Sequence, residues 1–173
     1  MKRITAVAVS FALNIVLIAW GRGSFLAVFL PMVLSLWIGL PLLILSVVFY
    51  IIANRKNRLR IMNVSSWGIA IAMIIFSTLL SIPAGKRILA GDMNDGQSFC
   101  NSLVLQLENT KNHTGEYPRD ISNVLKGQRP PRLLHSGFYQ SDGTSFSFII
   151  TDPGDIMGGV EYSSQTKRWS HWD

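Results

Sequence analysis

The sequence predicts a membrane protein with three transmembrane α-helices and a small extracytoplasmic α+β domain, in which a helix is followed by an antiparallel β-meander. Three observations lead to this fold class. Long apolar segments without charge lie before residue 90, all ten acidic residues lie after it, and a basic cluster separates two of the apolar segments. We therefore expect a membrane domain at residues 1–89 and an outer domain at residues 90–173.

The charge distribution argues against a nucleic-acid-binding protein, although the whole chain has a formal net charge of +6. Residues 1–89 contain nine cations and no acid, whereas residues 90–173 contain seven cations and ten acids, a net charge of −3. The positive charge thus lies in short clusters beside apolar segments, where it contacts lipid headgroups. A nucleic-acid footprint needs a basic face on a folded domain, which the acidic C-terminal part does not supply.

The first apolar segment, residues 4–20, carries no charge and follows a short basic start. A helix of this length just crosses a hydrocarbon core of about 30 Å. A basic start before an apolar run also describes a signal peptide cleaved after Gly21. We favour a retained helix, because the run is long for a signal and Trp20 crowds the cleavage site. Either alternative leaves the same final topology.

The second and third apolar segments follow at residues 25–52 and 67–83. Pro31 and Pro41 divide the second, so we expect a tilted or kinked span. Pro83 is expected to end or bend the helix of the third. Small residues in this third segment, such as Gly68, allow neighbouring helices to approach closely, although small residues are common in membrane helices in general.

The basic cluster at residues 54–60, with the sequence NRKNRLR, determines the orientation. Its four cations are Arg55, Lys56, Arg58 and Arg60. With the N-terminus inside, the inner side holds six cations, counting Lys2 and Arg3, and the outer side holds three, Arg22, Lys86 and Arg87. Because inner loops are enriched in Lys and Arg, we expect a cytoplasmic N-terminus and a cytoplasmic loop at 54–64. The C-terminal domain then faces the periplasm of a bacterial inner membrane.

The C-terminal domain begins with a predicted helix at residues 92–111. Phe99, Leu103 and Leu107 recur at helical spacing and give it one apolar face, on which we place the only cysteine, Cys100, as a small core residue. The helix is expected to end at 112–115, and Asp120 to cap a short second helix at 121–126.

Four strands follow. Residues 137–141 and 144–151 flank Asp142-Gly143, a strong hairpin signal. Residues 160–164 and 168–172 complete a meander.

This arrangement resembles the soluble part of type IV pilins and type II secretion pseudopilins over residues 95–172. The resemblance depends on a helix leading out of a membrane span, the sequence NHTGEYP at residues 112–118, and the following β-meander. Pilins have one apolar helix with a glutamate near its start, whereas this chain has three apolar segments and no acid in any of them. The resemblance therefore implies a domain shape and not filament assembly.

Calcium is the one cofactor that the sequence suggests. Pseudopilin-like domains often hold calcium in a β-loop, and oxygen ligands are available here from Asp142, Asp152 and Asp155. Asp, Pro and Gly are also ordinary turn residues, and the spacing is not that of an EF-hand. We favour the interpretation as turns, with no cofactor.

The C-terminal strand and one loop contain the residues that we consider for partner binding. Trp169 and His171 are expected on one strand face and Trp172 on the other. Tryptophan is enriched at binding hot spots, but aromatic residues also fix a terminal strand to its sheet, and we favour this structural role. Arg129 and Arg132 are suited to contact an acidic partner, with a solvated surface as the default.

No catalytic pattern emerges from the sequence. The three histidines are far apart, and there is no G-x-S-x-G elbow. We therefore expect a non-enzymatic inner-membrane protein with a periplasmic protein-binding domain, such as an immunity protein or an accessory subunit of an envelope complex. The alternatives are a small hydrolase-like envelope enzyme and an accessory component of a channel or transporter.

Overall fold

The computed structural model describes residues 2–56 and 58–172, with the side chains of residues 2–4 and 6 excepted. The predicted orientation signals at Lys2 and Arg3 are therefore outside the described side chains. The chain divides into two compact units, Met1–Arg87 and Ile88–Asp173, which we call unit 1 and unit 2. The sequence places the boundary two residues later, between 89 and 90.

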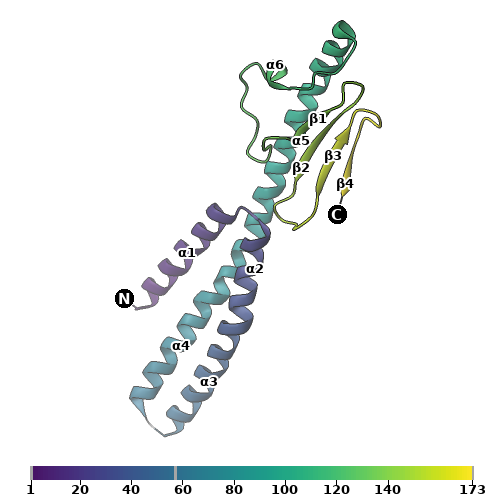
Figure 1. The fold of residues 1–173 in the computed structure, drawn as a ribbon. Helices are drawn as coiled ribbons and strands as arrows, with labels where there is room; N and C mark the ends of the chain where they lie inside the picture. The colour runs from purple at the N-terminus through teal and green to yellow at the C-terminus, as the bar shows by residue number, and fades with distance from the viewer. Residues whose placement is uncertain (1, 57, 173) are drawn as a thin grey trace. The chain divides into compact units, whose positions relative to one another are not determined.

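Unit 1 is entirely helical (Figure 1). It contains α1 (Lys2–Gly21), α2 (Phe25–Leu34), the π-helical segment η1 (Ser35–Gly39), α3 (Leu40–Arg55), α4 (Leu59–Ser77), the 3₁₀ segment η2 (Thr78–Leu80) and the start of α5 (Ser81–Thr114). Two continuous helical stretches, Phe25–Arg55 of 31 residues and Leu59–Thr114 of 56 residues, are long and apolar enough to cross a membrane. The apolar part of α1, Val7–Gly21, is shorter.

Two prolines explain the irregular turns in these helices. A proline ring clashes with the carbonyl four residues earlier in the chain, and it offers no N–H to that carbonyl. For Pro41 this carbonyl belongs to Trp37, within the π-helical turn, and for Pro83 it belongs to Leu79, within the 3₁₀ turn. The change in helical pitch accommodates each ring. The helix therefore does not end near Pro83, as one alternative predicted, but continues as α5.

The connection between α3 and α4 is shorter than the predicted loop at 54–64. The helix α3 ends at Arg55 and α4 begins at Leu59. A hydrogen bond from the Arg58 N–H to the Ala53 carbonyl, 2.9 Å long, closes the turn. Most of the basic cluster thus lies on the helix ends.

Unit 2 is an α+β domain in which α5 covers one face of a four-stranded sheet (Figure 1). The short helix α6 (Ser122–Leu125) precedes the sheet, whose strands are β1 (Tyr139–Ser141), β2 (Phe146–Thr151), β3 (Gly159–Ser163) and β4 (Arg168–Trp172). All neighbours are antiparallel, in the order β1-β2-β3-β4. The predicted helix followed by a β-meander is therefore confirmed.

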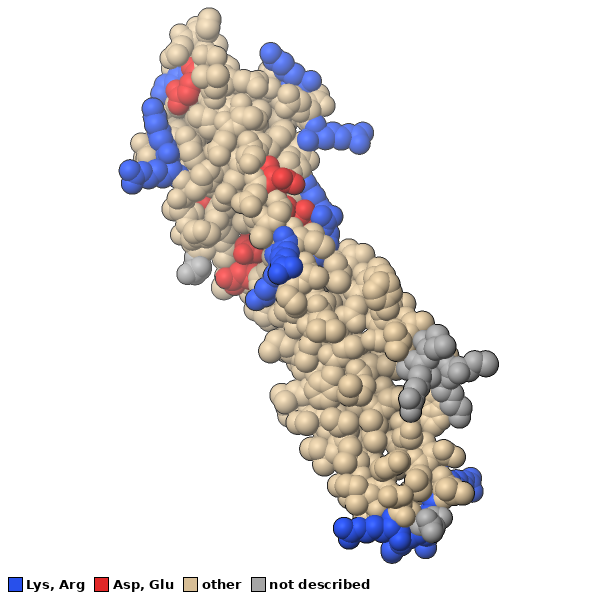
Figure 2. Space-filling view, turned by 180° about the vertical axis from the view of Figure 1, so that it is seen from behind, with Lys and Arg blue, Asp and Glu red and all other residues tan. Residues whose placement is uncertain are grey.

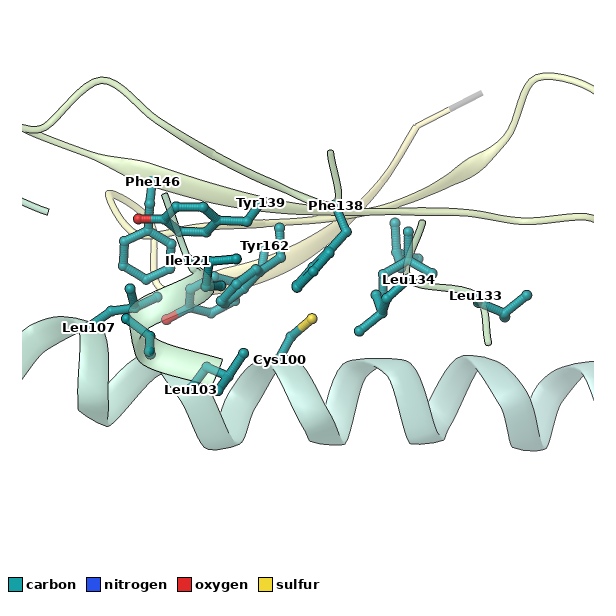
Figure 3. Packing of buried hydrophobic residues seen from close by; sticks show 14 of the residues in the cluster. Cys100, Leu103, Leu107, Ile121, Leu133, Leu134, Phe138, Tyr139, Phe146 and Tyr162 are labelled. Carbon is teal, nitrogen blue, oxygen red and sulfur yellow. The ribbon is translucent and has the colours of Figure 1, made fainter. Parts of the chain in front are cut away.

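The core of unit 2 lies between α5 and the sheet (Figure 3). Cys100, Leu103 and Leu107 on α5 are completely buried, as the helical spacing predicted. The sheet contributes a cluster of aromatic rings, of which Phe146 and Phe148 lie 5.3 Å apart between centroids. Helix and sheet approach closely at Gly96, where an added Cβ would lie 3.2 Å from Ile150 Cδ1.

Two turns form where the sequence predicted them. The helix α5 ends at Thr114, and Gly115 follows with a φ of +88°, a left-handed conformation that glycine adopts without strain. The hairpin turn between β1 and β2 has Gly143 at a φ of +89°. At α6, the Asp120 carboxylate accepts a hydrogen bond of 2.9 Å from the Ser122 N–H. The N-cap position is nevertheless Ile121, so the predicted capping role of Asp120 is wrong by one residue.

Candidate functional site

Unit 2 has an open groove of about 790 Å³ between the C-terminal part of α5 and the segment that leads into α6. We call it the α5 groove. From α5 it is lined by Gln106, Asn109, Thr110, His113 and Thr114, and from the following segment by Glu116, Tyr117, Pro118, Arg119, Asn123, Val124 and Lys126. Most of these side chains carry amide, hydroxyl or charged groups, so the groove is suited to polar ligands.

Hydrogen bonds to the sheet fix the wall of the groove opposite α5. The Tyr117 N–H donates to the Gly143 carbonyl at 2.8 Å, and the Tyr139 hydroxyl donates to the Pro118 carbonyl at 2.6 Å. The Tyr117 ring is buried and lies edge-on against Phe146, with ring centroids 4.8 Å apart. Because backbone and side chain are both held, this wall is preorganised rather than formed on binding.

The Tyr117 side chain also connects the wall to α5. Its hydroxyl donates to Glu108 Oε1 at 3.0 Å, and the Lys111 ammonium lies 4.3 Å from its ring centroid. Burial, followed by the hydrogen bond to the Glu108 carboxylate, raises the pKa of Tyr117 to about 12. The phenol therefore stays neutral at physiological pH and acts as a hydrogen-bond donor with a structural role.

The α5 side of the groove presents polar groups along one helical face. Gln106, Asn109, Thr110 and His113 occupy positions i, i+3, i+4 and i+7. The Thr110 hydroxyl donates to the Gln106 carbonyl at 2.9 Å, and His113 Nδ1 lies 2.7 Å from the Asn109 carbonyl oxygen. The amide groups of Gln106 and Asn109 are the groups of this face suited to contact a ligand.

Charges are concentrated at the rim of the groove. Arg119 and Lys126 contribute two cations and Glu116 one carboxylate, and all three side chains are exposed. Lys126 has a left-handed backbone with φ 47°, and Gly127 follows at φ 82°. This turn ends α6 and places the Lys126 backbone at the rim. The rim has a small excess of positive charge, although unit 2 as a whole is acidic.

The groove contains no recognisable catalytic arrangement among the residues that the structure describes. The hydroxyls of Thr110 and Thr114 both donate to backbone carbonyls at 2.9 Å. Within the described ranges, no group of three His, Cys, Asp or Glu side chains is arranged to hold a metal ion. The side chains of the groove offer hydrogen bonding and charge complementarity.

The aromatic residues of the last strand have different environments. Trp169 is half-buried, with its ring centroid 5.5 Å from that of Tyr162 and its Nε1–H donating to Asn101 Oδ1 at 3.0 Å. It thereby fixes the edge strand β4 to α5. His171 is exposed and pairs with Val160 of β3, on the same sheet face as Trp169. Trp172 lies on the other face and covers Gly159, with 37% of its surface exposed.

The predicted arginine contacts lie in the loop between α6 and β1. Arg129 and Arg132 are exposed, but neither lines the α5 groove. They remain available for a partner that extends beyond it.

The three aspartates proposed as calcium ligands are not brought together. Asp142 lies in the β1–β2 turn, and its Oδ1 accepts hydrogen bonds from the N–H groups of Thr144 (2.8 Å) and Ser145 (2.7 Å). These bonds lower the pKa of Asp142 to about 2. Asp152 and Asp155 lie in the β2–β3 loop, at the other end of β2. A six-residue strand spans about 17–20 Å, too far for one ion to share these carboxylates.

Sequence reasoning missed the α5 groove, although one signal for it was present. The polar residues at 106, 109, 110 and 113 recur with the same helical period as the apolar face. Such a face usually indicates only solvation. What makes it part of a groove is the return of residues 116–126 alongside α5, which depends on contacts distant in sequence.

Comparisons with known proteins find no family model that matches the chain, no matching curated protein and no matching solved structure. The resemblance of unit 2 to pilin and pseudopilin domains therefore stays a prediction.

Proposed function

We propose that the chain is a bacterial inner-membrane protein with three transmembrane helices, which holds unit 2 in the periplasm as a non-enzymatic protein-binding domain. The α5 groove is the binding site in this proposal. The observation that carries it is the pattern of burial in unit 1.

Burial in unit 1 is the reverse of that in a soluble protein. Every described side chain or glycine that is buried there is small, or is proline: Gly21, Gly23, Ala27, Pro31, Ser35, Gly39, Ser46, Ala53, Ser65, Ala72, Thr78, Ser81 and Gly85. Large apolar side chains point outward, and 74% of Trp37 and 71% of Leu80 are exposed. Small residues at helix contacts and large apolar residues outside are typical of helices surrounded by lipid.

The lengths of the helices agree with this environment. No charged residue lies between Arg22 and Arg55, or between Arg60 and Lys86. A helix of 31 residues, such as Phe25–Arg55, is about 46 Å long and exceeds a hydrocarbon core of about 30 Å, so it crosses with a tilt.

Polar contacts support α1 as a third, retained span. The hydroxyls of Ser10 on α1 and Ser77 on α4 are hydrogen-bonded, and Asn14 Nδ2 lies 3.4 Å from Ser77 Oγ. The same Asn14 amide donates to the Ser10 carbonyl at 2.8 Å. Hydrogen bonds between helices stabilise their association within a bilayer, where water does not compete. A cleaved signal peptide has no need of such contacts with the mature chain.

The proposed orientation of the chain across the membrane depends on the positive charges at the end of the α3–α4 pair. The side chains of Arg55, Lys56, Arg58 and Arg60 are all exposed around the short connection. Figure 2 shows Lys and Arg side chains gathered at this end of unit 1, beyond a surface of uncharged residues. The positive-inside rule places this end in the cytoplasm and, after the third span, unit 2 in the periplasm.

The partner in this proposal is a protein segment that lies in the α5 groove. Its polar lining, preorganised wall and charged rim support hydrogen bonding to a peptide chain with an acidic or amide-rich sequence. Two functions fit such a site, an immunity protein that intercepts a toxin outside the membrane and an accessory subunit of an envelope complex. Arg129 and Arg132 would extend the contact.

Photo-crosslinking in living cells tests the proposal. A photoreactive amino acid is introduced in the full-length chain at Asn123 or Asn109 in the groove, and at Gln165 in the β3–β4 turn as a matched exposed control. We expect both groove positions to crosslink to the same partner protein, and Gln165 to give no such product. Equal crosslinking from all three positions, or none from the groove, would contradict it.

A further inference from the structure

The β2–β3 loop carries two exposed apolar side chains that the proposed function does not use. Ile156 is 70% exposed and Met157 is 74% exposed, at the tip of the loop. Trp172, at the end of β4, pairs with Gly159 at the same end of the sheet and is partly exposed. We call Ile156, Met157 and Trp172 the loop patch.

The loop has a defined shape that presents these side chains outward. The Asp152 N–H donates to the Gly158 carbonyl at 2.9 Å and closes the base of the loop. Asp152 Oδ1 accepts from the Gly154 N–H at 2.7 Å, and the Asp155 N–H donates to the Asp152 carbonyl at 3.1 Å. These bonds hold the backbone of the loop in shape, while the side chains of Asp155, Ile156 and Met157 remain exposed.

The loop patch lies at the end of unit 2 where the chain enters from the preceding helix. Met93, on the first turns of α5 within unit 2, lines a small cavity of about 70 Å³ together with Asp152, Asp155 and His171. The opposite end of the sheet contacts the end of α5, where the Lys111 ammonium donates to the Thr144 carbonyl at 3.4 Å. Figure 1 shows the β2–β3 loop and the β3–β4 turn at opposite ends of the sheet.

The chemistry of this end suits the surface of a bilayer. Met93 follows Arg87 by only six residues, which span at most about 22 Å of chain, and Lys86 and Arg87 mark the headgroup level in the proposed topology. Transfer of isoleucine and methionine side chains out of water is favourable, and tryptophan prefers the region between headgroups and acyl chains. Asp152 closes the loop base and the exposed Asp155 directly precedes Ile156. Anionic lipids would repel both carboxylates, so attraction by apolar groups must dominate.

We propose that the loop patch enters the interface of the same bilayer, at the boundary between headgroups and acyl chains. The loop patch therefore binds lipid, and a zwitterionic bilayer is sufficient for this contact. The contact gives unit 2 a second attachment to the membrane besides α5. Because unit 2 is then held at two points, its orientation toward a partner is restricted. This inference rests on the membrane topology proposed above.

Site-specific fluorescence in phosphatidylcholine vesicles tests the contact. The full-length chain is labelled with an environment-sensitive dye at Met157→Cys, at Gln165→Cys in the opposite turn, and at Met73→Cys on the exposed face of α4. Unmodified protein, whose buried Cys100 should not react, gives the background. We expect doxyl-labelled lipid to quench the dye at position 157 severalfold more than at position 165, and aqueous iodide to do the opposite.

The three positions separate failure of this inference from failure of the proposed function. A dye at position 73 that is quenched by lipid, with positions 157 and 165 equally open to iodide, would overturn the loop contact and leave the membrane protein intact. A dye at position 73 that iodide quenches freely would overturn both. A second variant, Ile156→Asp in the Met157→Cys protein, should abolish lipid quenching at 157, and unchanged quenching would contradict the role of the apolar tip.

Discussion

Gly68 on α4 lies so close to Ser46 on α3 that a Cβ added at Gly68 would overlap the Ser46 hydroxyl. The contact joins the two long helices of unit 1 at a position where neither has a large side chain. Gly39 makes a similar approach to Ile75, at 3.1 Å from an added Cβ to Ile75 Cγ2. The helices of this pair therefore approach closely at glycine positions, where side chains of the facing helix lie against the glycine backbone.

Substitution at Gly68 should consequently destabilise unit 1. We expect Gly68→Leu to lower the free energy of unfolding by about 1–3 kcal/mol, because the added side chain forces the helices apart. Ser66→Leu, on an exposed position of the same helix, is the matched control and should change it by less than about 0.5 kcal/mol. Thermal unfolding of the detergent-solubilised protein, followed by circular dichroism, measures both. Equal effects would argue against the close helix contact.

Cys100 should be unreactive in the folded protein. It is completely buried, and burial raises the pKa of its thiol from 9.0 to about 12. Since the raised pKa favours the neutral thiol in the folded state, the stabilisation is present below pH 9 and is lost as the pH rises from about 9 to 12. We expect N-ethylmaleimide to modify wild-type protein at neutral pH only after denaturation. Rapid modification of the native protein would contradict the packing of α5 on the sheet.

Trp169 should stabilise unit 2, whereas Trp172 should contribute little. Trp169→Ala removes both the contact with Tyr162 and the hydrogen bond to Asn101, and we expect a loss of about 2–3 kcal/mol in the free energy of unfolding. Trp169→Phe retains a ring and should lose about 1 kcal/mol. Trp172→Ala is the control, with a loss below about 1 kcal/mol. Denaturant unfolding of the full-length variants gives these values, and a larger loss for Trp172→Ala would reverse the assignment.

The hairpin turn should depend on ionised Asp142. Its pKa is lowered to about 2 by hydrogen bonds from Ser145 and Thr144, so the carboxylate stabilises the turn above about pH 4. This stabilisation is lost as the pH falls through about 2. Carbon-detected NMR of the Asp142 carboxyl group measures the titration directly. An ordinary midpoint near 3.8, the reference pKa for an aspartate, would show that the turn does not hold the ionised form.

The sequence was sufficient to predict those features of the fold that depend on local signals. The hairpin follows from Asp142-Gly143, the end of α5 from Gly115, and the buried face of α5 from the spacing of Leu103 and Leu107. The continuation of the helix past Pro83 was harder to predict. A proline signals a break, and only the 3₁₀ turn before it shows how the chain accommodates the ring.

The candidate site was less predictable, because contacts between distant segments create it. The hydrogen bond between Tyr117 and Gly143 joins residues that no local pattern relates, and it forms one wall of the α5 groove. The sequence suggested Trp169 and Arg129 as candidate partner contacts from residue type alone, although a structural role was favoured for Trp169 and a solvated surface for Arg129. The structure places Trp169 against α5, and Arg129 outside the groove. Residue type indicates what a side chain can bind, whereas only packing determines where it is presented.

The orientation of the chain in the membrane is the central claim, and cysteine labelling in intact cells tests it most directly. Gln165→Cys in unit 2 and Asn54→Cys at the α3–α4 connection are both exposed, and buried Cys100 supplies little background. We expect a membrane-impermeant maleimide to label position 165 in intact cells and position 54 only after lysis. Labelling of position 54 in intact cells, with position 165 protected until lysis, would contradict it.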